Sequence, residues 1–113
     1  MNYREDLLLA QCHIWLWNTH PETRYLAWHI ANERHVPSAV AAQLRSKGVV
    51  SGVPDYVFNW QSKTTYFEFK SSTGKQTTNQ QLAQTALTNQ GFDYHIIKDF
   101  NTFVSLIENI LNQ

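Results

Sequence analysis

The sequence has no long apolar run and no pair of cysteines. Its longest apolar stretches fall far short of the roughly 20 residues that a membrane-spanning helix needs, so no association with a membrane is expected. A basic, then apolar leader that ends at a small-residue cleavage site is also missing, which predicts that there is no signal peptide. Cys12 is the one cysteine among 113 residues, which excludes an internal disulfide and predicts a cytoplasmic location.

An excess of charge of either sign is missing too. Nine Lys and Arg residues balance nine Asp and Glu residues. Domains that bind nucleic acid usually carry a basic excess, so the composition by itself argues against such a partner. That argument weakens if acidic side chains bind a metal ion, because the basic residues then remain in excess. Apolar residues make up 42% of the chain, a proportion typical of a folded domain, and the length predicts one domain spanning residues 1–113.

Periodicity and turn residues divide the chain into helices and strands. Helices are expected at 3–18, 37–45, 79–90 and 100–112. Strands are expected at 25–30, 64–70 and 93–98, together with a central hairpin that turns at 59–63. The first helix is expected to carry a broad apolar stripe of Leu7, Leu8, Cys12, Ile14, Trp15 and Trp17, with the two tryptophans in the core or in a dimer interface. The third is expected to begin at a capping box formed by Thr78 and Gln81.

The order of these elements predicts an α/β fold with a mixed sheet. The strand at 64–70, the helix at 79–90 and the strand at 93–98 form a βαβ crossover, which places its two strands parallel. The central hairpin is antiparallel. Hairpin and crossover together therefore predict a mixed β-sheet that is flanked by helices on its faces.

Three ionisable residues stand inside the apolar sequence of the central hairpin. Asp55 opens the first strand, and Glu68 and Lys70 end the second. Because side chains alternate in a strand, Glu68 and Lys70 share one face while Phe67 and Phe69 take the other. A charge in an apolar strand is costly to bury without a partner. We therefore expect the two acids and the lysine to meet at the ends of paired strands.

This set of residues suits metal-assisted hydrolysis of a phosphodiester. Two carboxylates make a hard oxygen site of the kind that Mg²⁺ or Mn²⁺ takes. Such an ion acidifies a bound water and stabilises the charge on the phosphoryl oxygens. Simpler interpretations also exist: Asp55 can form a turn after Pro54, and Glu68 and Lys70 can be polar because they lie on the exposed face of an edge strand.

The ordered set of motifs resembles a nuclease family. Pro54-Asp55 followed by Glu68-Phe69-Lys70 resembles the signature of the PD-(D/E)XK nuclease superfamily. Residues 48–58 are similar to the Gly-x-x-x-Gly-x-Pro-Asp segment of its virus-type VRR-NUC members, and residues 74–80 are similar to the polar loop and helix start that carry their glutamine. The resemblance implies a restriction-endonuclease-like core and a metal-dependent endodeoxyribonuclease.

The resemblance implies a role for each matching residue in the strands. Asp55 and Glu68 would bind Mg²⁺ or Mn²⁺, with the backbone carbonyl of Phe69 as a further ligand. Lys70 would orient or activate the attacking water, and the product would carry a 5′-phosphate.

Two further positions have a structural alternative. Gln80 would support the site or contact the DNA backbone, although Gln80 and its neighbour Gln81 stand at the start of a helix. Glu5 would be an additional acidic ligand from the first helix, but its position three residues after Asn2 equally fits a capping box.

The resemblance also implies the partners. DNA, branched or duplex, is the expected substrate, and a homodimer would suit a Holliday-junction-resolvase-like enzyme of a phage or a bacterium, acting in the host-cell cytoplasm if the chain is viral. Basic residues that can contact DNA phosphates are Lys75, Arg34, Arg45 and Lys47. The alternatives are a module with the nuclease fold that binds nucleic acid without cutting it, and a protein-interaction subunit.

Overall fold

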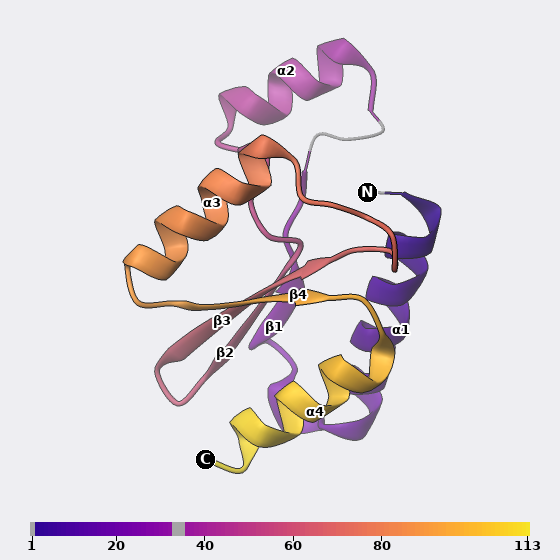
Figure 1. Cartoon of the computed structure of the whole chain (residues 1–113), viewed down its shortest axis with the longest axis vertical. Helices are drawn as coiled ribbons and strands as arrows, with labels where there is room; N and C mark the ends of the chain where they lie inside the picture. The colour runs from indigo at the N-terminus through magenta and orange to yellow at the C-terminus, as the bar shows by residue number, and fades with distance from the viewer. Residues whose placement is uncertain (1, 33–35) are drawn as a thin grey trace.

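The computed structural model describes residues 2–32 and 36–113 (Figure 1). Its helices are α1 (Tyr3–Thr19), α2 (Ser38–Ser46), α3 (Thr78–Asn89) and α4 (Phe100–Leu111), with a short 3-10 turn η1 (Pro21–Thr23) after α1. Its strands are β1 (Ala27–His29), β2 (Tyr56–Trp60), β3 (Lys63–Phe69) and β4 (Asp93–Ile97). The expected elements are all present, and most bounds differ by one to three residues.

The four strands form one mixed sheet in the order β1-β2-β3-β4. β1 pairs antiparallel with β2, and β2 pairs antiparallel with β3. β3 pairs parallel with β4 across the helix α3. The predicted combination of a central hairpin and a βαβ crossover is therefore confirmed. It makes β2 and β3 the interior strands and leaves β1 and β4 at the edges.

Helices cover both faces of this sheet, as Figure 1 shows for α3 on one side and for α1 and α4 on the other. The apolar core lies between the sheet and the α1–α4 pair, where Phe58 and Phe67 of the sheet meet Phe103 and Ile107 of α4 and Leu16 of α1. The buried positions of β2 and β3 on that side alternate as the period of a strand requires. The alternate positions face α3.

The apolar stripe predicted for α1 is only partly buried. Cys12 belongs to the core and Leu8 and Trp15 pack against it, as predicted. Leu7, Ile14 and Trp17 instead are 52%, 58% and 41% exposed, so this part of the stripe lies outside the core. The helix is apolar over much of its circumference, and the core takes only the face that includes Cys12.

The start of α3 also differs from its prediction. The capping box is formed by Thr77 and Gln80, one residue before the predicted pair of Thr78 and Gln81. Two overlapping Thr-x-x-Gln spacings stand in the sequence, and the first one closes both hydrogen bonds of the motif. Across the described segments 2–32 and 36–113, no helix combines the length and the apolar character needed to cross a membrane.

Candidate active site

The two acids are neighbours across the β2–β3 hairpin. Tyr56 pairs with Phe67 in the antiparallel register, and the next step of that register brings Asp55 opposite Glu68. Residues directly opposite each other in a sheet share a face. Both carboxylates are buried, with Asp55 1% and Glu68 0% exposed. Since β3 is an interior strand, the interpretation of Glu68 as part of an exposed edge is excluded.

Asp55 is held in place through its side chain and its backbone. Its Oδ2 accepts a hydrogen bond from the backbone N–H of Phe69 at 2.8 Å. Its carbonyl oxygen accepts hydrogen bonds from the backbone N–H of Ile30 at 2.8 Å and from Nδ1 of His29 at 2.8 Å. These contacts join the β1 edge to β3 through Asp55. Asp55 is therefore held between β1 and β3 at the start of β2, and these contacts are more than a turn after Pro54 requires.

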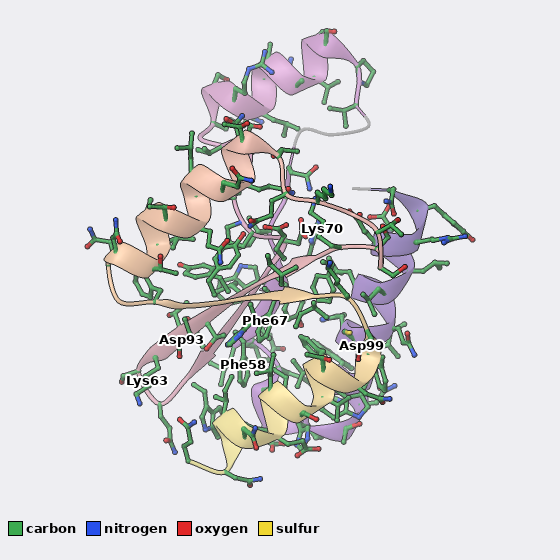
Figure 2. All side chains as sticks on the ribbon, viewed as in Figure 1. Phe58, Lys63, Phe67, Lys70, Asp93 and Asp99 are labelled. Carbon is green, nitrogen blue, oxygen red and sulfur yellow. The ribbon has the colours of Figure 1, made fainter. Side chains whose placement is uncertain are left out.

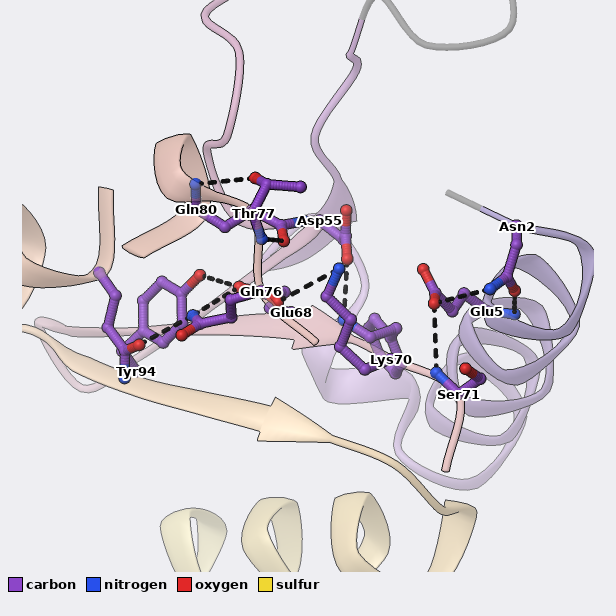
Figure 3. Close-up of polar contacts among 12 residues, drawn as sticks. Asn2, Glu5, Asp55, Glu68, Lys70, Ser71, Gln76, Thr77, Gln80 and Tyr94 are labelled. Carbon is purple, nitrogen blue, oxygen red and sulfur yellow. Dashed lines mark hydrogen bonds and ion pairs between the residues drawn. The ribbon is translucent and has the colours of Figure 1, made fainter. Parts of the chain in front are cut away.

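Glu68 has one well-bonded oxygen and one that is not (Figure 3). Its Oε1 accepts a hydrogen bond from the Tyr94 hydroxyl at 2.6 Å and one from Nε2 of Gln76 at 3.1 Å. Its Oε2 is buried and accepts no hydrogen bond within the described part of the chain. Burial, and then the hydrogen bond to Glu68, raise the pKa of Tyr94 above its usual range. Tyr94 therefore remains protonated and acts as the donor.

Lys70 faces the same side as the acids. Its Nζ lies 3.8 Å from Oε2 of Glu68, and the side chain is almost fully buried. The backbone N–H of Lys70 donates to the carbonyl of Ile97 at 2.9 Å, which ties the end of β3 to the end of β4. The structure thus brings Asp55, Glu68 and Lys70 together on one face of the sheet, as the alternation of the strands predicts.

Gln80 and Glu5 both lie close to this group with structural hydrogen bonds of their own (Figure 3). Oε1 of Gln80 accepts a hydrogen bond from the backbone N–H of Thr77 at 2.8 Å, which completes the capping box of α3. Oε2 of Glu5 accepts hydrogen bonds from the backbone N–H of Ser71 at 3.2 Å and from Nδ2 of Asn2 at 2.9 Å. Glu5 therefore anchors the loop that follows Lys70 to α1.

The donor set around Asp55 and Glu68 fits a hard divalent cation. Two buried carboxylates directly opposite each other repel unless a cation lies between them. Oε2 of Glu68, which is buried without a hydrogen bond from the described residues, is the kind of oxygen that a metal ion satisfies. No group of three or more His, Cys, Asp or Glu side chains suited to a metal occurs in residues 2–32 and 36–113. Metal roles for Asp55, Glu68, Glu5 and the Phe69 carbonyl stay predictions.

Two residues of this site were not found from the sequence. Tyr94 is in register with Tyr66 on the parallel strand β3, so it shares the face of Glu68. The alternation of side chains along the strands could therefore have predicted its position. Gln76 donates to Oε1 of Glu68 at 3.1 Å and to Oε1 of Gln84 at 2.8 Å. It lies in a loop without periodicity, where the sequence carries no comparable signal.

The basic residues expected to contact DNA are spread over the molecule. Lys75 is exposed in the loop between β3 and α3. Arg45 and Lys47 are exposed at the end of α2, and Arg34 lies outside the described residues. Their predicted contacts with phosphates stay predictions.

Comparison of the whole structure with solved structures finds a match described as "VRR_NUC domain protein". The match has a TM-score of 0.76 and 18% sequence identity, and it covers 99% of this chain and 91% of that one. The chain has the VRR-NUC fold. No protein-family model matches the sequence, and no match is found among curated proteins. The similarity to this protein is therefore detected in the three-dimensional structure. The VRR-NUC fold confirms the nuclease-like core that the ordered motifs predict.

Proposed function

We propose that this protein is a metal-dependent endodeoxyribonuclease that hydrolyses phosphodiester bonds, with a preference for branched or junction DNA. One observation supports the proposal above the others. On a VRR-NUC fold, two buried carboxylates stand opposite each other on paired strands, and a buried lysine lies 3.8 Å from one of them. Glu5 and Gln80 make structural hydrogen bonds, whereas Oε2 of Glu68 is buried without a hydrogen bond from the described residues.

Each residue of the cluster has a distinct part in the proposed reaction. Asp55 and Glu68 would hold Mg²⁺ or Mn²⁺, which supplies a water of lowered pKa and offsets charge on the phosphate. Lys70 carries its ammonium group to the same place, where it orients the attacking water and favours the negative phosphate. Tyr94 and Gln76 hold Oε1 of Glu68, so that Oε2 is the oxygen left to turn toward a ligand.

The test is a cleavage assay on four-way junction, flap, duplex and single-stranded DNA, each with Mg²⁺, with Mn²⁺ and with EDTA. We expect cleavage in the presence of metal and none in EDTA. Asp55→Asn keeps an oxygen that can accept the Phe69 N–H but removes the charge, so it is expected to abolish cleavage while DNA binding persists. Lys70→Ala is expected to do the same.

The outcomes separate the proposal from its alternatives. Metal-independent DNA binding without cleavage of any substrate would indicate a binding module on the nuclease fold. A chain that neither cuts DNA nor shows an affinity that falls with salt would indicate a protein-interaction subunit, because release of phosphate counterions produces that salt dependence. Cleavage at the normal rate by Asp55→Asn would show that the metal centre lies elsewhere.

We also propose that the protein acts as a homodimer. The exposed apolar residues of α1 recur at alternating spacings of four and three, which is the seam of a helix that packs against another helix. We name them the α1 stripe; they are Tyr3, Leu7, Ala10, Ile14 and Trp17. In the proposed dimer, the α1 stripe packs against the α1 stripe of a second copy, and the two helices run antiparallel.

Charges at the two ends of the α1 stripe support that orientation. Asp6 lies in the first turn of α1, about three turns before Trp17 and therefore on the same side of the helix. At the other end, the Arg24 guanidinium lies 4.8 Å from the centre of the Trp17 ring. An antiparallel two-fold arrangement would bring Asp6 of one copy toward Arg24 of the partner subunit, and the two-fold axis would repeat that contact.

A further inference from the structure

Beside the candidate active site lies a basic hollow, which adds Lys98 and Gln81 to the residues that the motifs and the resemblance indicate. Its volume is about 390 Å³, and its polar lining comes from Lys70, Lys75, Lys98, Gln76 and Gln81. We call it the lysine hollow. It borders the end of β3 and β4 and the loop that leads into α3, so it opens directly next to Glu68 and Lys70.

The parallel register explains why two of its lysines are neighbours. Phe69 pairs with Ile97, and the following residue of each strand is a lysine. Lys70 and Lys98 therefore leave adjacent strands at the same edge and toward the same face. Like charges at such neighbouring positions repel each other. The net charge of the whole chain is zero, so these neighbouring lysines form a local concentration of positive charge.

Only one of the three positive charges is balanced nearby. Lys70 lies 3.8 Å from Oε2 of Glu68. Lys75 and Lys98 form no ion pair with any described residue and are exposed. The acid next in the chain, Asp99, is engaged elsewhere, because its carboxylate accepts hydrogen bonds from the N–H and hydroxyl of Thr102 at the start of α4. No acidic side chain from the described residues lines the hollow.

We propose that the lysine hollow binds a phosphate group of the DNA backbone, next to the phosphate that is cleaved. Lys75 and Lys98 would supply the charge, and the side-chain amide of Gln81 is a further hydrogen-bond donor. Gln76 then links the two sites, since its Nε2 already donates to Glu68. The inference rests on the proposed function for its substrate, and it adds Lys98 and Gln81 as residues that hold the DNA strand.

The experiment measures DNA affinity without cleavage. Fluorescence anisotropy with a labelled duplex and a labelled four-way junction is recorded in EDTA over a series of salt concentrations. Because each neutralised phosphate adds about 0.9 to the slope of log affinity against log salt, Lys98→Gln is expected to lower that slope by about one. Charge reversal in Lys98→Glu is expected to weaken binding further, by at least several-fold.

Lys63 provides a matched control. It is an exposed lysine at the start of β3, and Lys70 follows the other end of that strand. Figure 2 shows that Lys63 lies far from Lys70 and therefore from the lysine hollow. Lys63→Gln is expected to leave the salt slope unchanged. Equal effects of Lys63→Gln and Lys98→Gln would overturn the lysine hollow as a specific site. Thermal unfolding of each variant, expected to match the wild type because both side chains are exposed, shows that the fold is kept.

A second arm separates a DNA phosphate from a free phosphate ion. Inorganic phosphate and chloride are compared as competitors at equal ionic strength. Equal displacement of DNA supports the proposal, whereas a specific effect of inorganic phosphate that disappears in Lys98→Gln would reassign the hollow to the free anion. If Lys98→Gln weakens binding selectively but the wild type never cuts DNA, the proposed function fails and the hollow stands. If the wild type cuts DNA and Lys98→Gln binds DNA normally, the proposed function stands and the lysine hollow is rejected as a phosphate site.

Discussion

The side chains around Glu68 show how a strand buries a charge at the scale of single residues. A carboxylate with no exposed surface is stable only with partners for its oxygens. Tyr94 and Gln76 donate hydrogen bonds to Oε1 of Glu68, and Nζ of Lys70 lies near Oε2. Alternation along β3 predicts which residues share the face, and it therefore places Glu68 and Lys70. It says nothing about Gln76, which reaches the site from an irregular loop.

Replacing Tyr94 by Phe tests this support. The change removes the hydroxyl that donates to Glu68 at 2.6 Å and keeps the ring. Because a hydrogen bond to a charged group contributes about 1.5–3 kcal/mol, we expect the free energy of unfolding in urea to fall by that amount. We also expect weaker binding of Mn²⁺, since Glu68 is then less well fixed.

Tyr66→Phe is the matched control for Tyr94→Phe. Tyr66 is the register neighbour of Tyr94 on β3, and its hydroxyl has no hydrogen-bond partner among the residues described in the structure. Its loss is expected to leave stability and Mn²⁺ affinity close to those of the wild type. Similar losses in both variants would mean that the hydrogen bond to Glu68 contributes nothing particular.

At the scale of elements, the loop before β2 is shaped by its contact with α3. Gly52 has a φ of +88°, and a Cβ on it would lie 2.4 Å from the backbone carbon of Asn79. The Nδ2 of Asn79 also donates to the hydroxyl of Ser51 at 3.1 Å. This close approach sets the start of α3 beside the segment that leads to Asp55. The repeated glycines are visible in the sequence, but the element that they meet is not.

Gly52→Ala and Gly48→Ala form a pair that separates strain from contact. Both glycines have positive φ, at +88° and +98°, but a Cβ on Gly48 meets nothing within 4 Å. Gly48→Ala is expected to cost about 1–2 kcal/mol from backbone strain. Gly52→Ala adds overpacking against Asn79, which costs about a further 1–3 kcal/mol. Urea unfolding measures both, and equal losses would contradict the importance of the contact with α3.

The capping of α3 shows why element boundaries are harder to predict than elements. Thr77 and Thr78 each have a glutamine three residues later, so sequence alone offers two equivalent starts. The structure uses Thr77 with Gln80, and Gln80 is then 2% exposed. Packing against the sheet therefore decides the start of the helix, and the same packing brings Gln80 close to the site.

At the scale of the whole molecule, α1 has two apolar sides and the core uses one. A helix that is apolar over most of its surface is normally buried. The sequence pattern predicts a large apolar stripe, but it does not tell which part faces the core and which faces a partner. Figure 1 shows α1 along one margin of the molecule, with no other element beyond it. The homodimer would bury this remaining side.

Ile14→Lys tests the interface. It places a charge in the middle of the α1 stripe, where the wild-type side chain is 58% exposed, so the variant is expected to fold normally and to sediment as a monomer at micromolar concentration, where the wild type is expected to sediment as a dimer. Leu82→Lys is the control, because Leu82 is an equally apolar and exposed residue, at 63%, on α3. A monomeric wild type, or an equal effect of both changes, would reject the α1 stripe as the interface.

The bond between Lys70 and Ile97 has a consequence for the order in which the protein matures. Asp55 and Glu68 are synthesised before β4, the strand that carries Tyr94 and Ile97. Until β4 is in place, Glu68 lacks the hydrogen bond from Tyr94, and the end of β3 is paired only with β2. A growing chain therefore carries Asp55 and Glu68 before their supporting residues, and the cluster is complete only after β4 has paired with β3.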